Sequence, residues 1–332
     1  MSKPRIAISI GDFNGIGPEI ILKTLSAADL GKSTPVIMSP KKVIDHALAS
    51  LGDIPVHFAK DISDVSDEII NVLPVENNEV ELSPGVQSIE SGKVAMQSIE
   101  KCIDLCVSGE TQAMVTAPIS KESVNLAGYK IPGHTEFLAS QTQTDEVLMM
   151  LVSGNLRVAL VTTHIPVSDV SKAITSEAMQ TKLEILINTL KHDFGIEHPK
   201  IAVFGLNPHA GDGGVIGKEE IDTIDPVIKS MQESHKDITL NGPFPADGFF
   251  GQKMHQKHDA ILAMYHDQGL APFKLLSFGK GVNFTAGLPI IRTSPDHGTA
   301  FDIAGKGIAN PSSFKEAYEL AVELANKRTL EN

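Results

Sequence analysis

The sequence lacks the features of three broad classes of protein. It has two cysteines among 332 residues, Cys102 and Cys106, too few for a disulfide framework. It has no apolar run long enough to cross a bilayer. Its 28 lysines and arginines are outnumbered by 41 aspartates and glutamates, which gives a net charge of −13 without any basic stripe. These absences exclude a disulfide scaffold, a membrane-spanning protein and a protein that binds nucleic acid through a basic surface.

The remaining composition is typical of a globular protein. Apolar residues make up 42% of the chain, enough for a sizeable core. At this length we expect one large α/β unit or two domains. Residues 1–5 lead directly into a strand-like run, so we expect no signal peptide and a cytoplasmic location. The two cysteines are four residues apart in a helical pattern, and we interpret both as core residues.

Strands and helices alternate along the chain. Runs typical of buried strands cover residues 5–10, 35–38, 113–117, 147–152, 156–161, 200–204 and 260–264. Helical patterns cover residues 18–25, 41–51, 88–108, 176–192 and 312–327, with further helices starting near Ser120 and Lys218. Residues 153–155 separate two strands as a hairpin turn does. The pattern predicts a mostly parallel sheet with helices on both faces and an antiparallel hairpin in its middle. No linker is visible, so any two domains are intimately joined.

A glycine-rich loop follows the first strand and opens a helix at residues 11–19. Glycines permit a tight turn, and the amino end of a helix favours an anion or a polar substrate. The spacing is not that of the dinucleotide-binding fingerprint. A purely structural turn and a ligand-binding loop both remain open for this segment.

Three histidines lie in short polar segments directly after apolar strands: His164, His209 and His266. Loops at the carboxyl ends of parallel strands can converge, and three imidazoles suit zinc or a related divalent ion with one open coordination position. For each histidine alone, a hydrogen-bonded loop residue is the alternative. We interpret seven further histidines as solvated, because they lie in charged, helical or surface-like stretches: His46, His57, His192, His198, His235, His255 and His258.

Other residues are typical partners of a phosphate group. His134 and Thr135 lie at an expected helix start, where side chains and free amides bind phosphate or carboxylate. Lys274, Asn283 and Arg292 each lie near a glycine or proline, and lysine and arginine are the usual phosphate ligands. Each could equally be a surface residue, because spacing alone does not bring them together.

Seven stretches together resemble one enzyme family over the whole length of the chain. They are residues 14–19, 116–121, 133–137, 162–164, 205–211, 263–269 and 292–300. The family is that of the 4-hydroxythreonine-4-phosphate dehydrogenases of pyridoxal phosphate biosynthesis. The first loop and residues 297–310 also resemble the isopropylmalate dehydrogenases, in which the second of these loops holds the adenosine half of NAD. The chain departs from the family pattern at Phe13-Asn14, where an acidic residue, proline and alanine are usual, and at Gly248, where a hydroxyl residue is frequent.

The resemblance implies an α/β fold like that of the isocitrate and isopropylmalate dehydrogenases, with two α/β/α subdomains and a cleft between them. Residues 1–130 and 275–332 would form the larger domain with the cofactor loop. Residues 131–274 would form the second domain, with the metal ligands and the dimer interface. The implied assembly is a homodimer whose active site lies at the subunit interface, with one metal ligand supplied across it.

The resemblance also assigns roles to residues. His164, His209 and His266 would bind a divalent metal, with zinc as the first choice and magnesium or cobalt as alternatives. His134, Thr135, Lys274, Asn283 and Arg292 would bind the substrate, largely at its phosphate. Gly298, Asp302 and Asn310 would bind NAD or NADP. An Asp302 carboxylate bound to the ribose hydroxyls would favour NAD, and a helix cap is the alternative role for this residue. Lys121, Asp247 and Asp267 are the candidates for proton transfer or for support of the metal ligands.

The implied activity is the NAD-dependent oxidation of 4-phosphohydroxy-L-threonine, followed by decarboxylation to 3-amino-2-oxopropyl phosphate. A sister enzyme acting on threonate or erythronate 4-phosphate would share the metal and phosphate residues. A metal-dependent hydrolase or aldolase would use the histidines without a nicotinamide, and the loop at residues 297–310 disfavours it. A non-catalytic binding protein on this scaffold is disfavoured because no member of the ligand set is missing.

Overall fold

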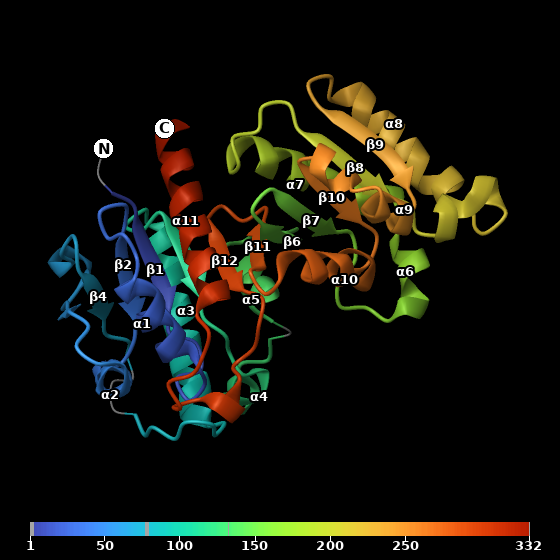
Figure 1. Ribbon diagram of the computed structural model, residues 1–332. Coiled ribbons are helices and arrows are strands. Elements are labelled where there is room, and N and C mark those ends of the chain that lie inside the picture. Colours follow the sequence, from blue (N-terminus) through green and yellow to red (C-terminus); the bar gives the residue numbers. More distant parts are fainter. Residues whose placement is uncertain (1–2, 77–79, 132, 332) are drawn as a thin grey trace. The chain divides into compact units, whose positions relative to one another are not determined.

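The computed structural model describes residues 3–76, 80–131 and 133–331 (Figure 1). The chain divides into two compact units, which are described separately below. Unit 1 comprises Met1–Asp145 and Leu288–Asn332, and unit 2 comprises Glu146–Gly287. Both combine a sheet with surrounding helices, so the predicted α/β class is confirmed.

The unit boundaries lie later in the chain than the positions 130/131 and 274/275 expected from the sequence. Two elements account for the difference. Helix α5 (His134–Gln141) belongs to unit 1, whereas strand β11 (Val282–Ala286) belongs to unit 2. There β11 pairs antiparallel with β6 (Leu148–Ser153) along its whole length. The sequence pattern predicted no strand at residues 282–286, so this pairing was not expected.

Unit 1 contains six strands in the order β3-β4-β2-β1-β5-β12. Their bounds are Val56–Phe58, Ile70–Leu73, Thr34–Met38, Arg5–Ser9, Ala113–Thr116 and Arg292–Pro295. Every pair in this series is parallel. The inner strands are buried, as expected for a parallel sheet covered on both faces. Because all the strands run the same way, the loops after β1, β5 and β12 leave from one edge.

The helices of unit 1 are α1 (Gly17–Ser26), α2 (Lys41–Leu51), α3 (Ile89–Val107), α4 (Lys121–Leu126), α5 (His134–Gln141) and α11 (Ser312–Glu331), with short 3₁₀ turns η1 (Ile62–Asp64) and η5 (Phe301–Ile303). Two of these helices, α3 and α4, begin at a serine whose side chain caps the helix. Ser88 and Ser120 each accept a hydrogen bond from a backbone amide in the first turn of α3 and α4. On α3, Cys102 is fully buried as predicted, whereas Cys106 is only half-buried and contacts the Thr111 hydroxyl.

Unit 2 contains strands in the order β11-β6-β7-β10-β8-β9. Beyond β11 and β6, the bounds are Leu156–Leu160 for β7, Ala260–Ala263 for β10, Lys200–Phe204 for β8 and Thr239–Phe244 for β9. β6 and β7 form the predicted antiparallel hairpin, with Gly154 at a positive φ of 55° in its turn. β7, β10, β8 and β9 are parallel. Strand β6 therefore runs antiparallel to both of its neighbours, β11 and β7.

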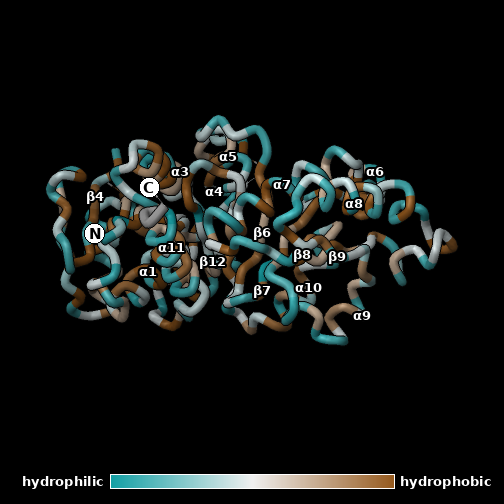
Figure 2. Tube along the Cα trace, turned by 90° about the horizontal axis from the view of Figure 1, so that it is seen from above, coloured by the Kyte–Doolittle hydropathy of each residue, from teal (hydrophilic) through white to brown (hydrophobic). Residues whose placement is uncertain are grey.

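The helices of unit 2 are α6 (Val167–Ala173), α7 (Ser176–His192), α8 (Asp225–Ser234), α9 (Ala246–Gly251) and α10 (His266–Ser277). Short 3₁₀ turns are η2 (Pro208–Gly214) and η4 (Met254–Lys257), and η3 (Glu220–Ile224) is a single π-helical segment. The helix expected near Lys218 therefore begins as a π turn. Phe204, Phe249 and Phe273 lie in the core of unit 2. Figure 2 shows hydrophobic and hydrophilic stretches alternating along the whole chain.

Not all of the histidines interpreted as solvated are so. His258 lies against the ring of Phe249 with centroids 5.4 Å apart, and its Nδ1 lies 2.9 Å from the Met254 carbonyl. His235 contacts the Glu184 carboxylate at 2.9 Å. The packing of His258 on an aromatic ring, and the contact of His235 with a residue 51 positions away, are not visible in the local sequence pattern.

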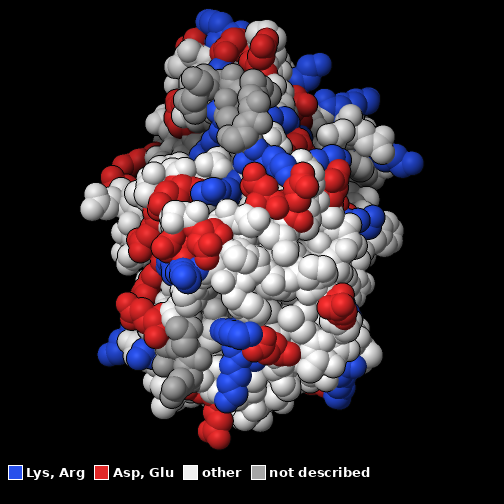
Figure 3. All heavy atoms as spheres, turned by 90° about the vertical axis from the view of Figure 1, so that its left-hand side faces the viewer, with Lys and Arg blue, Asp and Glu red and all other residues white. Residues whose placement is uncertain are grey.

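In the part of the chain that is described, no helix is both long and apolar enough to cross a membrane. Figure 3 shows one face of the molecule, on which acidic and basic side chains are interspersed rather than gathered by sign.

Candidate active site

The three predicted metal ligands follow three neighbouring strands of unit 2. His164 comes shortly after β7, His266 opens α10 directly after β10, and His209 comes shortly after β8. The strand order is β7-β10-β8, and all three strands are parallel. The loops that carry the histidines therefore leave from one edge of the sheet, as the sequence predicted.

His164 and His266 are brought close together, with ring centroids 6.1 Å apart. The loops that carry them are joined because Thr162 donates from its Oγ1 and its amide to the Met264 carbonyl, at 2.8 and 3.2 Å. Nδ1 of His266 lies 2.7 Å from a carboxylate oxygen of Asp267. This contact fixes the ring and leaves Nε2 of His266 available for a ligand.

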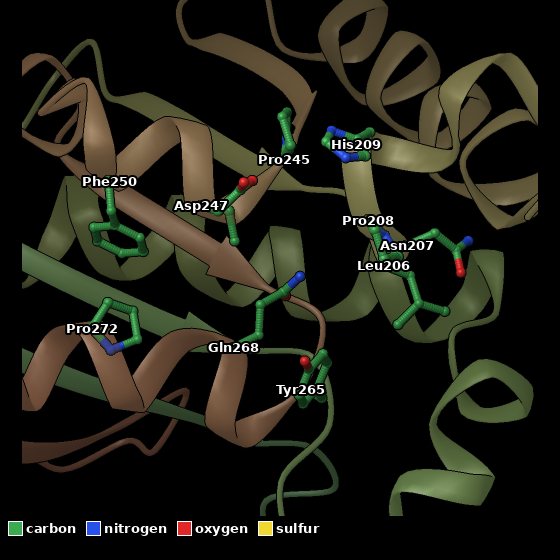
Figure 4. Close-up of a pocket in the computed structure, with 11 residues that line it drawn as sticks. Leu206, Asn207, Pro208, His209, Pro245, Asp247, Phe250, Tyr265, Gln268 and Pro272 are labelled. Atoms are coloured by element: carbon green, nitrogen blue, oxygen red, sulfur yellow. The ribbon is translucent and has the colours of Figure 1, made fainter. Parts of the chain in front are cut away.

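His209 lines a pocket of about 460 Å³ within unit 2 (Figure 4), whose lining does not include His164 or His266. Asp247, Tyr265 and Gln268 also line this pocket. Among the described residues, no three His, Cys, Asp or Glu side chains lie close enough to hold a metal ion. The structure therefore brings His164 and His266 together. Among the described residues of one chain, His209 does not complete a three-ligand cluster with them.

Gln268 connects the loops after β8 and β10. Its Nε2 donates to the Gly205 carbonyl and its Oε1 accepts from the Met264 amide, both at 2.7 Å. The role of Gln268 was not predicted from the sequence, in which only the neighbouring His266 and Asp267 have side chains typical of metal binding or proton transfer. Gln268 fixes the spacing of the backbones from which His209 and His266 project.

Asp247 lies at the start of α9, exposed to the pocket that contains His209. A side-chain carbon added at the neighbouring Gly248 would meet its nearest atoms, in Pro245 and Gln252, only at 3.8 and 4.0 Å. The departure from the family pattern at Gly248 is thus not forced by packing, because a hydroxyl residue would fit there.

Unit 1 holds a buried cation at the end of its sheet. Arg292 begins β12 and is only 1% exposed. Its Nε and Nη2 donate to the hydroxyl oxygen of Thr116, the last residue of β5, at 3.1 and 2.7 Å. Burial lowers the pKa of Arg292 to about 9, so the guanidinium is still charged at neutral pH. A buried charge of this kind favours an anionic partner.

His134 is the first residue of α5, and its Nε2 is buried without a hydrogen-bond partner in the described part of the chain. Burial, followed by the positive charges of Arg292 and Lys121, holds the pKa of His134 well below its usual value. The imidazole is therefore neutral at physiological pH. Lys121 opens α4, and Thr135 follows His134 in the first turn of α5. Two cations, a neutral imidazole and free helix amides form a site suited to a phosphate dianion.

The other two predicted substrate residues belong to unit 2. Lys274 is exposed on α10. Asn283 lies on β11, and its side-chain oxygen is buried without a hydrogen-bond partner in the described residues. The five predicted substrate ligands are thus divided between the two units.

The glycine-rich first loop supports the predicted cofactor loop. The Ile16 amide donates to the Thr299 carbonyl at 3.0 Å. A side-chain carbon at Gly15 would lie 2.8 Å from that same carbonyl oxygen, so glycine is required for the close approach. Lys23 donates to the carbonyls of Gly307 and Ala309, at 2.9 and 3.0 Å. These contacts give the loop at residues 11–19 a structural role.

The predicted cofactor residues Gly298, Asp302 and Asn310 are all exposed. The cap position of the short turn η5 is occupied by Ala300, so the alternative role of Asp302 as a helix cap is not found. Asn310 accepts hydrogen bonds from the Ser312 amide and hydroxyl, at 3.0 and 2.7 Å, at the start of α11. The Asp302 carboxylate is thus free of a capping role.

The departure at Phe13-Asn14 has a packing explanation. Both residues are buried. The Asn14 amide group donates to the Val86 carbonyl and accepts from the Ser83 amide, each at 2.9 Å. Neighbouring Asp12 is fully buried, and this burial raises its pKa. The two hydrogen bonds of Asn14 thus hold residues 83–86 against the first loop.

With this geometry established, comparison with known proteins identifies the family. Residues 31–321 match the family described as "Pyridoxal phosphate biosynthetic protein PdxA". The chain belongs to the PdxA family.

A curated 4-hydroxythreonine-4-phosphate dehydrogenase from Bacteroides thetaiotaomicron is 44% identical over 99% of this chain and 91% of its own length. One from Prosthecochloris aestuarii is 45% identical, with 98% of each chain covered. The crystal structure of the Klebsiella pneumoniae 4-hydroxythreonine-4-phosphate dehydrogenase superposes with a TM-score of 0.87 at 37% identity, covering 97% of this chain and 100% of that one.

A more distant likeness concerns the fold alone. An isocitrate dehydrogenase from Methylococcus capsulatus superposes with a TM-score of 0.50 at 12% identity, over 98% of this PdxA-family chain and 87% of that chain. The expected likeness to the isocitrate dehydrogenase fold is confirmed.

Proposed function

We propose that this PdxA-family chain is a cytoplasmic enzyme that oxidises 4-phosphohydroxy-L-threonine with NAD. Decarboxylation would then give 3-amino-2-oxopropyl phosphate, in pyridoxal 5′-phosphate biosynthesis. The observation that carries the proposal is the buried anion site formed by Arg292 and His134, in a chain whose relatives of that name match it over nearly its whole length. The same geometry supports a phosphorylated substrate, because a buried guanidinium interacts more favourably with an anionic ligand than with a neutral one.

The phosphate-binding residues would act as follows. The planar guanidinium of Arg292, oriented by Thr116, would donate to two phosphate oxygens. Nε2 of neutral His134, now without a partner among the described residues, would donate to a third. Thr135, Lys274 and Asn283 would complete the contacts to the substrate.

The metal-binding residues are His164, His266 and His209. The first two fit a divalent ion, because their rings are adjacent and the Asp267 contact leaves Nε2 of His266 available. We place the third imidazole on His209 of the partner subunit of a homodimer, since the described residues of one chain do not form a complete cluster. A bound zinc, magnesium or cobalt ion would lower the pKa of the substrate hydroxyl, so that the hydroxyl deprotonates near neutral pH.

Exposed apolar side chains of unit 2 support a homodimer. Val215, Leu275 and Phe278 are 83, 74 and 87% exposed. Leu275 and Phe278 lie three residues apart at the end of α10, and neighbouring exposed apolar groups are typical of an interaction surface. A second copy of the chain is the partner that would also complete the histidine set.

The cofactor residues are Gly298, Asp302 and Asn310. Bound NAD would accept a hydride from the substrate carbon. The exposed Asp302 carboxylate would accept hydrogen bonds from the adenosine ribose hydroxyls and would repel the 2′-phosphate of NADP. Lys23 and Ile16 would hold the loop in place for this contact.

Three residues are candidates for moving a proton. Asp247 lines the pocket that contains His209, so it is placed to accept a proton near the metal. Asp267 is already engaged with His266, which favours an orienting role. Lys121 lies beside the phosphate site, where its charge also lowers the pKa of His134.

The test is an assay of purified protein with a divalent metal, NAD and 4-phosphohydroxy-L-threonine, followed by NADH absorbance. We expect NADH to form with this substrate and not with unphosphorylated 4-hydroxythreonine. Turnover of threonate or erythronate 4-phosphate in its place would instead make the chain a sister oxidative decarboxylase. Loss of the NADH signal in Arg292→Ala at low substrate concentration would support the phosphate site.

A further inference from the structure

The turn that carries His209 has an unusual backbone. Six successive residues, 209–214, have positive φ angles of 54, 51, 79, 43, 65 and 95°. Three of them are not glycine: His209, Ala210 and Asp212. Residues with a side chain adopt this left-handed region singly and at a cost, so a run of six must be held by surrounding contacts.

The contact that holds the start of this turn is a buried carboxylate. Glu220 is 3% exposed. Its two oxygens accept from the backbone amide and the side-chain amide of Asn207, at 2.7 and 2.9 Å. Asn207 lies two residues before His209, and Pro208 between them provides no amide hydrogen. Glu220 therefore holds Asn207, the residue before Pro208, through both its backbone and its side chain. We call these two hydrogen bonds the clamp.

The neighbouring Glu219 strengthens the clamp. Its carboxylate accepts from the same Asn207 side-chain amide at 2.8 Å and from the Ser171 hydroxyl at 2.6 Å. These hydrogen bonds lower the pKa of Glu219 to about 2, so it is ionised at neutral pH. The π-helical segment that starts at Glu220 accompanies this arrangement of two adjacent carboxylates at one asparagine.

Glycines let the turn fold over the carboxylate. A side-chain carbon added at Gly211 would lie 2.6 Å from one Glu220 oxygen, and one added at Gly205 would lie 2.9 Å from the other. The backbone on both sides of His209 thus lies against Glu220. Sequence analysis recognised the glycines and the histidine but attached no role to either glutamate.

We propose that Glu220 is a positioning residue, which holds the left-handed turn and so presents the His209 ring before any metal ion binds. The proposal rests on the proposed role of His209 as a metal ligand. Pre-ordering of this turn removes the loss of backbone freedom that metal binding would otherwise have to offset.

The test compares Glu220→Gln with the control Asp222→Asn, which removes an exposed carboxylate from the same π turn. Glutamine is nearly isosteric but turns an amide group toward the Asn207 amide, so one accepting oxygen is lost. Hydrogen–deuterium exchange is measured on the metal-free proteins. We expect faster exchange in peptides covering residues 205–217 in Glu220→Gln alone, and unchanged exchange across β10 in both variants.

Titration with Co²⁺ provides a second readout. We expect Glu220→Gln to bind about 10- to 100-fold more weakly than wild type at the same stoichiometry, as for other residues that orient metal ligands. If Glu220→Gln does not fold, Asn207→Ala removes the side-chain half of the clamp and is measured in the same way.

Unchanged exchange in residues 205–217, or exchange that rises equally throughout the chain, would overturn the positioning role. Because this measurement is made without metal, it decides the role of Glu220 independently of the enzyme assay. A wild-type protein that binds no divalent ion would count against the proposed function, whatever the exchange result.

Discussion

Arg292 donates two hydrogen bonds to one atom, the hydroxyl oxygen of Thr116, across neighbouring strands β12 and β5. The guanidinium is buried, so the hydroxyl fixes the plane in which its remaining donors point. The orientation of this cation therefore depends on a residue 176 positions away in the sequence.

Replacement of that hydroxyl is expected to weaken substrate binding. Thr116→Val keeps the shape of the side chain but removes the acceptor, and a hydrogen bond to a charged group contributes about 1.5–3 kcal/mol. We expect KM for the phosphorylated substrate to rise about 10- to 100-fold, with a smaller effect on kcat. Thr116→Ser retains the hydroxyl and is the matched control. Equal kinetics in the valine and serine variants would show that the hydroxyl does not orient Arg292.

The pKa of Arg292 predicts a dependence of binding on pH. Burial lowers this pKa from its usual range to about 9. The charged form predominates below the folded pKa, so phosphate binding is complete there and is lost as the pH rises through about 9. We expect KM for the phosphorylated substrate to rise above that pH. KM for NAD, measured over the same pH range, serves as the control and should show no such rise.

Unfolding would not account for that loss. The folded pKa of Arg292 lies below its unfolded value, so the folded state releases the proton first as the pH rises. This group therefore contributes increasing stability as the pH rises above about 9. Circular dichroism over the same range checks that the fold persists; a KM that stays flat while the protein remains folded would contradict the prediction.

Two glycines provide a matched pair of substitutions. Gly15→Ala would place a carbon 2.8 Å from the Thr299 carbonyl oxygen and so displace the proposed cofactor loop. Gly248→Ser enters a space whose nearest atoms are at 3.8 Å. We expect the first to raise KM for NAD several-fold with little change in phosphate binding, and the second to leave both within about twofold. Steady-state kinetics with each substrate varied in turn would reveal the reverse order if the loop is not the cofactor site.

Strong local patterns were sufficient to predict much of the fold. The helices at residues 41–51 and 176–192 and the strand at residues 200–204 have the predicted bounds, because each combines clear periodicity with flanking turn or cap residues. The short strands β3 and β4 and the polar strand β9 were missed. These segments are strands because each pairs with a parallel neighbour, and their own few residues have no clear strand pattern.

The candidate site could be predicted only in part, for a similar reason. Histidines at strand ends are visible in a sequence, and the structure confirms that their three strands are neighbours. The roles of Thr116, Gln268 and Glu220 come from hydrogen bonds to distant or backbone atoms. Threonine, glutamine and glutamate are common residues, so no local pattern distinguishes these three from surface residues.

The division of the histidines between subunits can be tested by mixing two inactive variants. His164→Ala and His209→Ala should each abolish metal binding and turnover while leaving the fold intact, with His46→Ala as an exposed control. If a site takes His164 and His266 from one subunit and His209 from its partner, a hybrid dimer contains one site without substitutions. After dissociation and reassociation of an equal mixture, half of the dimers are hybrids with one of two sites intact, so activity should return to about a quarter of wild type.

The same mixture separates the shared site from a site built within one chain. If all three imidazoles came from a single subunit, each subunit of the hybrid would still lack one ligand, and no activity would return. The requirement for subunit exchange is checked by mixing the two variants without the dissociation step, which should leave the mixture inactive. Recovery should also coincide with uptake of about one divalent ion per hybrid dimer, because only the intact site holds three imidazoles.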